Sequence, residues 1–267
     1  KISKKRGLKI LDIKDQYKII NDISNPLIGS FQVKNLAMAV QAAKICNLSS
    51  KQIYNALKNI RDIEGRLNFV KKFPNNIKVF VDFAHTPEAL REVLSSLKKF
   101  YKGNISVVFG CGGERDKKKR PMMAKIAKTF CNKMYVTDDN PRNENPKKIR
   151  EEITRNLKNK DYFSIGNRSD AIKRSILNAD PNEIILIAGK GHENYQDYGK
   201  KVISVSDKTI IKNIKYNKKL ITKDEQISLF NSKILNEIIE NKTKCHFNGL
   251  SIDSRDIKRG NIFLAIK

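Results

Sequence analysis

Residues 77–109, IKVFVDFAHTPEALREVLSSLKKFYKGNISVVF, decide the fold of this chain. Two short apolar runs, Ile77 to Phe83 and Ile105 to Phe109, have the length and composition of buried strands. Between them, Thr86 and Pro87 are typical of the start of a helix, because Thr caps the first free N–H groups and Pro suits the first turn. A strand–helix–strand unit of this kind predicts two parallel strands with a helix packed across them.

The same alternation continues towards the C-terminus. Apolar runs at 105–109 and 134–137 precede helices expected to begin at Pro121 and Pro146, and strands at 162–165 and 183–188 flank a helix at 168–179. The fold class predicted is therefore α/β, a doubly wound and mainly parallel sheet with helices on both faces.

Other segments flank this alternating region. Small and apolar residues recur at helical spacing over 35–57, with a polar break at 47–50, so we expect two helices that end near 61–66. After residue 207 the chain becomes rich in Lys and Asn, and a new unit is expected near Thr222, with an amphipathic helix at 227–239 and a strand at 263–266 that is cut short. The chain is expected to be truncated at both ends.

The composition limits the class of protein. A length of 267 residues predicts two or three units, and neither an apolar run of 18 residues nor a signal peptide occurs, so we expect a cytoplasmic protein. Cysteines 46, 111, 131 and 245 lie far apart, which favours reduced thiols without a disulfide framework or a metal site. Cys111 lies in a Gly-rich loop without a catalytic partner nearby and is interpreted as a small loop residue.

The formal net charge of +26 raises the hypothesis of nucleic-acid binding. The basic residues are scattered, mostly Lys, in a chain that is also rich in Asn and Ile, which is typical of AT-rich coding sequence. No aromatic RNA-binding signature occurs and Trp is absent. Weak attraction of anionic substrates is the favoured interpretation, and a basic nucleic-acid-binding protein is kept as an alternative.

Three polar loops follow predicted strands. They are TDDNPRNENP at 137–146, GCGGERD at 110–116 and GKGHE at 189–193. Because open α/β sheets bind ligands at the carboxyl ends of their strands, we expect these loops to form one site. Arg142 can hold a carboxylate through two parallel hydrogen bonds, although Asp, Asn and Pro also favour an ordinary surface turn.

Four motifs resemble the C-terminal domain of the Mur ligase family in order and spacing. They are VDFAHTPEAL at 81–90, GCGGERDKKKRP at 110–121, DNPR at 139–142 and AGKGHENYQ at 188–196. The resemblance extends roughly from Pro26 to Asp207. Four independent motifs are far more specific than a lone glycine pattern.

The resemblance implies an ATP-dependent ligase of peptidoglycan synthesis. Such enzymes phosphorylate a substrate carboxylate and let an amine attack the acyl phosphate, and the branch resembled here adds the third residue of the stem peptide. The implied partners are UDP-MurNAc-L-Ala-D-Glu, meso-diaminopimelate and ATP, with Mg²⁺ as cofactor and neither a dedicated nucleic acid nor a membrane. A non-catalytic module that binds diaminopimelate or nucleotide remains the alternative.

The resemblance also implies roles for individual residues. The DNPR arginine marks family members that take meso-diaminopimelate instead of lysine, since diaminopimelate carries a second carboxylate at its far end. The implied substrate-binding residues are Arg115, Asp139, Asn140, Pro141, Arg142, Gly189 and Glu193, and the implied ATP-binding residues are Asn35, Arg66, Asp82 and His85.

The sequence contains no GxxxxGK[ST] loop, which in this family lies in the central domain together with most magnesium ligands. We therefore expect residues 1–66 to be the end of that central ATP-binding domain, 67–207 the C-terminal domain and 208–221 a linker, so that the chain is inactive alone. Residues 249–255 and 259–265 resemble the start of a Mur ligase UDP-sugar-binding domain, with Ser254 as a candidate contact. A partial second ligase over 222–267, of the type that adds D-Ala-D-Ala, is therefore expected to be fused behind the first.

Overall fold

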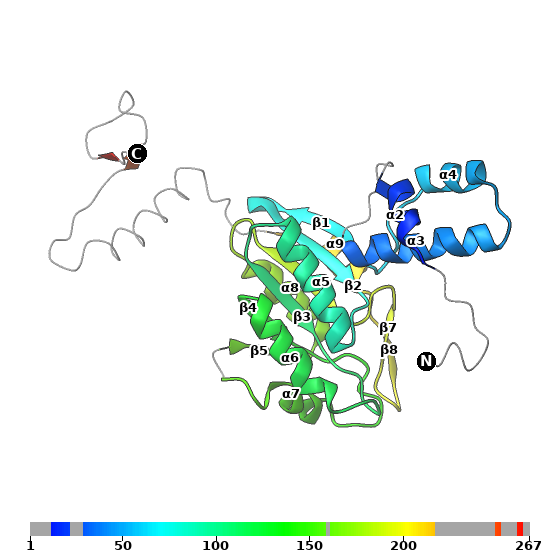
Figure 1. Cartoon of the computed structure of the whole chain (residues 1–267). Helices are drawn as coiled ribbons and strands as arrows, with labels where there is room; N and C mark the ends of the chain where they lie inside the picture. The colour runs from blue at the N-terminus through cyan, green and yellow to red at the C-terminus, as the bar shows by residue number, and fades with distance from the viewer. Residues whose placement is uncertain (1–11, 22–28, 159–160, 217–248, 252–260, 264–267) are drawn as a thin grey trace. The chain divides into compact units, whose positions relative to one another are not determined.

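The computed structural model describes residues 12–21, 29–158, 161–216, 249–251 and 261–263 (Figure 1). The chain divides into two compact units, residues 1–216 and 217–267. The first unit contains the sheet, the helices around it and the candidate site.

A six-stranded sheet forms the centre of the first unit. Its strands lie in the order β1-β2-β6-β3-β4-β5. All neighbours pair in parallel except β1, which is antiparallel to β2. The predicted α/β fold with a mainly parallel sheet is thus confirmed, whereas the edge strand β1 was not predicted. The strands are β1 (Asn68–Phe73), β2 (Ile77–Asp82), β3 (Ile105–Phe109), β4 (Lys133–Val136), β5 (Phe163–Ser164) and β6 (Ile184–Ala188).

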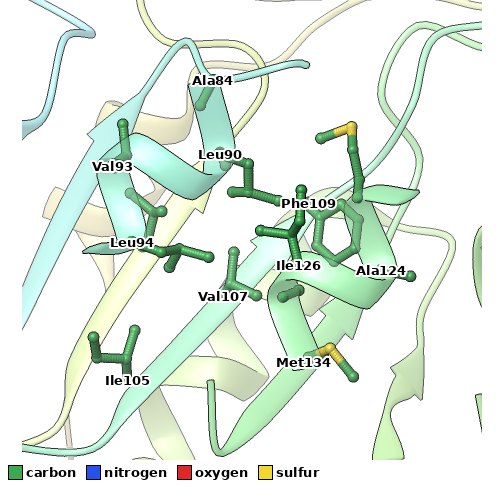
Figure 2. Packing of buried hydrophobic residues seen from close by; sticks show 14 of the residues in the cluster. Ala84, Leu90, Val93, Leu94, Ile105, Val107, Phe109, Ala124, Ile126 and Met134 are labelled. Carbon is green, nitrogen blue, oxygen red and sulfur yellow. The ribbon is translucent and has the colours of Figure 1, made fainter. Parts of the chain in front are cut away.

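Helices cover both faces of the sheet. Helices α5 (Pro87–Phe100), α6 (Lys119–Phe130) and α7 (Pro146–Thr154) lie on one face, and α8 (Arg168–Leu177) and α9 (Asp207–Asn213) pack on the other (Figure 1). Figure 2 shows side chains of α5 and α6 packed on Val107 and Phe109 of β3. The next residue of β3, Val108, belongs to the core cluster of the opposite face. Successive side chains of β3 therefore alternate between the cores on the two faces of the sheet.

Helix starts follow the capping residues. The Thr86 side chain accepts a hydrogen bond from the N–H of Ala89, and α5 and α7 begin at Pro87 and Pro146, as predicted. Helix α6 begins at Lys119, two residues before the predicted Pro121. Pro121 is thus its third residue, where the missing N–H costs nothing because the first-turn N–H groups have no partner within the helix.

Among the described residues, three helices precede the sheet. They are α2 (Lys14–Asn21), α3 (Ser30–Ile45) and α4 (Ser50–Lys58). The two helices expected over 35–57 are therefore present, and Ser49 and Gln52 form a capping box at the start of α4. Helix α3 contacts the segment between α4 and β1, where Gln32 Nε2 donates to the carbonyl of Arg66 at 3.1 Å. Assignment of these helices to an ATP-binding domain stays a prediction.

The stretch after residue 207 differs from the expected solvated linker. Residues 207–213 form α9, and Ile211 and Ile214 are buried against α8 and the sheet. In the second unit, β9 (Gly249–Ser251) pairs in parallel with β10 (Asn261–Phe263). The expected helix at 227–239, Ser254 and residues 264–266 lie outside the described residues. Among the described helices, none has both the length and the apolar character needed to cross a membrane.

Candidate functional site

A pocket of about 520 Å³ opens at the carboxyl ends of the strands. It gathers the three loops predicted to meet, after β3, β4 and β6, together with the segment after β2. Seven predicted residues line it, namely His85, Arg115, Asp139, Asn140, Arg142, Gly189 and Glu193. Pro141 is buried beside this lining. The predicted convergence of these loops agrees with this arrangement.

Glycine residues allow the loops after β3 and β4 to make direct backbone contact. A Cβ atom on Gly113 would lie 1.8 Å from the carbonyl oxygen of Pro141, and one on Gly110 would lie 2.3 Å from that of Thr137. The Gly113 N–H donates to the Asn140 carbonyl at 2.9 Å. The loop after β3 therefore packs directly on the backbone of the DNPR segment, which only glycine permits.

Arg142 presents its guanidinium to the pocket from a constrained backbone. Its φ is +52°, in the left-handed region, and its N–H donates to the Asp197 carbonyl at 2.9 Å. Nη1 donates to the Gly113 carbonyl at 2.7 Å, whereas the Asp197 carboxylate is 3.9 Å from Nε. Because its closest partner is a neutral carbonyl, the guanidinium keeps most of its capacity to bind a carboxylate.

Asn140 and Glu193 are held together by a buried lysine. Asn140 Nδ2 donates to Glu193 Oε2 at 3.1 Å. Lys190 Nζ donates to Asn140 Oδ1 at 3.0 Å and to Glu193 Oε2 at 2.8 Å. Oε1 of Glu193 has no protein hydrogen bond among the described residues, so it can receive an ammonium group of a ligand.

Asp139 packs over the loop after β6. Its Oδ1 accepts the N–H of Asn140 at 2.8 Å, and its Oδ2 would be 2.7 Å from a Cβ atom on Gly189. Gly189 also has a φ of +112°, which side chains disfavour. Gly189 is thus required both for the turn and for the approach of Asp139.

The other end of the pocket carries Arg115, Asp116 and Lys119. Arg115 is exposed. Lys119 Nζ donates to the His85 carbonyl at 2.8 Å, and the His85 ring lies with Nδ1 2.8 Å from the Phe83 carbonyl. This end is open and basic, and suits an anionic group.

A hairpin that sequence analysis missed supports the DNPR segment from behind. It consists of β7 (Tyr195–Asp197) and β8 (Val202–Ser204). Buried Gln196 donates from Nε2 to the carbonyls of Asp138 at 3.0 Å and Asp139 at 2.8 Å. Tyr198 and Arg150 bind the Asp138 carboxylate, whose pKa is nevertheless raised by burial. The only sequence signal was that the AGKGHENYQ motif ends at Gln196.

The predicted ATP-binding residues are less closely gathered. Asp82 is 3% exposed and does not line the pocket, and its carboxylate accepts the N–H groups of Leu67 and Ala84, each at 2.6 Å. Burial raises its pKa despite these bonds. Exposed Arg66 stacks 4.6 Å from the Phe83 ring centroid, and Asn35 is an exposed residue of α3. Asp82 thus joins the segment before β1 to the end of β2, and its carboxylate is buried there.

Two further polar groups near the pocket have structural contacts. Arg120 is fully buried and binds both Glu144 and Glu152, at 3.0 and 2.6 Å. Hydrogen bonding from Arg120 lowers the pKa of Glu144 to about 2. Burial raises the pKa of Cys111 to about 12, which disfavours the thiolate, so the structure gives no nucleophile there. Among the described residues, no cluster of three or more His, Cys, Asp or Glu could hold a metal ion.

The chain resembles known proteins across this whole region. Residues 65–191 match the family model described as Mur ligase, glutamate ligase domain. They include the loops after β2, β3 and β4 and the glycine turn after β6. This segment is therefore a Mur ligase C-terminal domain, and it belongs to that family.

Two relatives from different bacteria carry the same name. The chain is 42% identical over 193 residues to the UDP-N-acetylmuramoyl-L-alanyl-D-glutamate--2,6-diaminopimelate ligase of Rickettsia montanensis, covering 72% of this chain and 40% of the relative. It is 40% identical over 189 residues to the ligase of the same name from Halalkalibacterium halodurans, covering 71% and 39%. The chain thus spans about 40% of the length of these relatives.

Solved structures of ligases have a similar fold. A structure of a ligase of the same name matches with a TM-score of 0.55 and 33% identity, covering 71% of this chain and 39% of that one. A pseudomurein peptide ligase from Methanothermus fervidus matches with a TM-score of 0.53 at 20% identity, covering 72% and 38%. A folylpolyglutamate synthase of Mycobacterium tuberculosis, solved with ADP and AMPPCP, gives 0.51 at 21%, covering 63% and 39%. The last two share the fold.

Proposed function

We propose that this chain supplies the amino-acid-binding domain of an ATP-dependent ligase that adds meso-diaminopimelate to UDP-MurNAc-L-Ala-D-Glu in peptidoglycan synthesis. The names of the relatives support this substrate pair. The observation that carries the proposal is the pairing of Arg142 with Asn140 and Glu193 in one pocket.

The pocket chemistry matches the far end of meso-diaminopimelate. That end carries one carboxylate and one ammonium on the same carbon. Arg142 offers a guanidinium whose 2.7 Å hydrogen bond goes to a carbonyl, and Glu193 offers an oxygen without a protein partner among the described residues. The far end of lysine carries the ammonium alone, so lysine bound in the same orientation would leave Arg142 without a carboxylate. A bidentate contact of this type favours the ligand with the carboxylate.

ATP and Mg²⁺ are proposed as the cofactors of the complete enzyme, with ATP supplying the phosphoryl group that activates the substrate carboxylate. Arg66 and His85 are the residues of this chain best placed to meet a nucleotide, because both are exposed next to Phe83 at the edge of the pocket. Each oxygen of the Asp82 carboxylate accepts one backbone N–H and retains a further lone pair, so the role at the ribose that the resemblance implies requires a ligand to reach this buried group.

A second ligase unit is proposed over residues 222–267, of the type that adds D-Ala-D-Ala. The support is the sequence resemblance of residues 249–255 and 259–265 to the start of a UDP-sugar-binding domain, together with the short parallel pair β9 and β10 in the same stretch. Expression of the longest natural polypeptide that contains this chain, followed by assays for both ligations, tests the fusion.

Ligand binding to the chain itself tests the principal proposal. Isothermal titration with meso-diaminopimelate and with L-lysine should show tighter binding of diaminopimelate. Arg142→Ala should weaken diaminopimelate binding by about 2 to 5 kcal/mol, because the ligand carboxylate loses a charged partner. The matched control is Arg91→Ala, since Arg91 is an exposed arginine of α5 outside the pocket.

Equal affinity for lysine and diaminopimelate in the wild type would contradict the proposal, as would undiminished binding in Arg142→Ala. The non-catalytic alternative is tested on the longest natural polypeptide. Release of ADP that requires UDP-MurNAc-L-Ala-D-Glu and diaminopimelate together supports the ligase, and binding without any turnover supports the module.

A further inference from the structure

Lys190 is the one lysine among the fully buried large side chains of the described residues. It is 0% exposed and lies directly after Gly189, beneath the pocket. Lysine is rarely buried completely unless its ammonium is paired, because an unpaired charge in the interior loses its hydration. The contacts of Lys190 should therefore explain why the chain places a charge there.

The ammonium of Lys190 contacts two residues of the proposed head-group site. Nζ donates to Asn140 Oδ1 at 3.0 Å and to Glu193 Oε2 at 2.8 Å, and it lies 5.2 Å from the centroid of the Tyr195 ring. The N–H of Asp197 also donates to Asn140 Oδ1, at 3.0 Å. With two donors on Oδ1, the orientation of the Asn140 amide is fixed and its Nδ2 faces Glu193.

Lys190 also sets the charge of the pocket. The lining residues include three cations, Arg115, Lys119 and Arg142, and four carboxylates, Glu88, Asp116, Asp139 and Glu193. Lys190 adds a fourth positive charge immediately beneath Glu193. The neighbouring charges outside the lining are Asp197 beside Arg142 and the buried pair Arg168–Asp207.

We propose that Lys190 is a specificity-determining positioning residue, which orients Asn140 and Glu193 and offsets the charge of Glu193 so that the pocket accepts a head group carrying both ammonium and carboxylate. This inference rests on the proposed function of the pocket. Without Lys190 the pocket is one charge more negative. It should then tolerate the bare ammonium of lysine but repel the carboxylate of diaminopimelate.

Diaminopimelate and two analogues separate the contributions of the distal ammonium and the distal carboxylate to binding. L-Lysine is diaminopimelate without the distal carboxylate, and L-2-aminopimelate is diaminopimelate without the distal ammonium. Binding of each ligand to the whole chain is measured by titration calorimetry for the wild type, Lys190→Met and Lys190→Arg. Exposed Lys200 in the hairpin turn provides the matched control, Lys200→Met.

In Lys190→Met the preference for diaminopimelate over lysine should fall by at least about tenfold, because a buried charged partner of the site is lost. The binding of aminopimelate should weaken at least as much as the binding of diaminopimelate. Lys190→Arg should recover part of the preference, and Lys200→Met should not change it. An unchanged preference, or equal weakening of all three ligands by Lys190→Met, would overturn the inference and assign Lys190 a purely structural role.

A second pair of variants covers the case in which Lys190→Met fails to fold. Glu193→Gln is compared with the double variant Lys190→Met/Glu193→Gln, in which no buried charge is left unpaired. Aminopimelate should bind several-fold more tightly to Glu193→Gln than to the double variant. Equal affinities would again overturn the inference.

Failure of the inference can be told apart from failure of the proposed function. If the wild type does not prefer diaminopimelate to lysine, the proposed function fails. If the wild type shows the preference but changes at Lys190 leave it intact, only the role of Lys190 fails.

Discussion

Arg120 and Arg142 bind adjacent backbone carbonyls of the loop after β3 and differ in their other partners. Arg120 is fully buried, and its guanidinium binds Glu144, Glu152 and the Gly112 carbonyl. Arg142 is 24% exposed, its short contact is to the Gly113 carbonyl, and its nearest carboxylate is 3.9 Å away. An arginine whose carboxylate partners are already present in the protein supports the fold, whereas one that faces a pocket with a neutral partner is available to a ligand.

The largest expected effect follows from removing Arg120. Arg120→Met should lower the free energy of unfolding by about 3 kcal/mol, because Glu144 and Glu152 lose their shared cation and an arginine with no exposure is replaced. Urea denaturation followed by circular dichroism measures the change. Arg142→Met serves as the comparison and should change stability by less than about 1 kcal/mol.

Similar stability losses in the two variants would show that Arg142 is also a structural residue. A small loss in Arg120→Met would show that the two glutamates are adequately solvated without it.

The next largest effect on stability is expected at the backbone contact between the loops after β3 and β4. Gly113→Ala places a Cβ atom 1.8 Å from the Pro141 carbonyl oxygen, so the loops must separate, at a cost of about 2 kcal/mol. At Gly112 the nearest atom is the movable Nη1 of Arg142, 3.0 Å away. Gly112→Ala is therefore the control for stability in thermal unfolding. If Gly112→Ala is the more destabilising change, Gly113 is not the point of backbone contact between these loops.

The smallest expected effect is a loss of stability at acidic pH. Hydrogen bonding from Arg120 lowers the pKa of Glu144 to about 2 in the folded protein. A carboxyl group with a depressed folded pKa contributes stability above its unfolded pKa of roughly 4.3, and this contribution is lost as the pH falls towards 2. Urea unfolding from pH 5 to pH 2 should show this loss in the wild type.

Glu144→Gln should flatten the pH dependence in that window. The carboxylate of Glu151, which lies on the surface of α7, provides the control through Glu151→Gln. A wild-type slope that persists unchanged in Glu144→Gln would refute the assignment.

The sequence could predict the parts of the fold that depend on local pattern. Apolar runs located β2, β3, β4 and β6, and Pro87 and Pro146 located two helix starts, because burial and backbone geometry act on neighbouring residues. The loops after the strands could be predicted to converge because ligands of open α/β sheets bind at the carboxyl ends of the strands. Strand β1 and the β7–β8 hairpin could not, since their residues alternate less clearly and their positions depend on partners distant in sequence.

Side-chain partners were harder to predict than positions. Asp82 was placed correctly at a strand end, but its oxygens are occupied by the N–H groups of Leu67 and Ala84. Lys190 was overlooked because lysine is usually exposed, and only the fold brings Asn140 and Glu193 to its ammonium. Such contacts depend on tertiary structure and leave no periodic signal in the sequence.

The claim that the Arg142 guanidinium binds the ligand carboxylate is tested most directly by an NMR titration. The titration follows the Nε–Hε signals of Arg142 and Arg120 in the same sample. Addition of meso-diaminopimelate should shift the Arg142 signal saturably and leave that of Arg120 in place, and L-lysine at equal concentration should shift neither. An unmoved Arg142 signal with diaminopimelate, or an equal shift with lysine, would contradict the assignment of Arg142 to the ligand carboxylate.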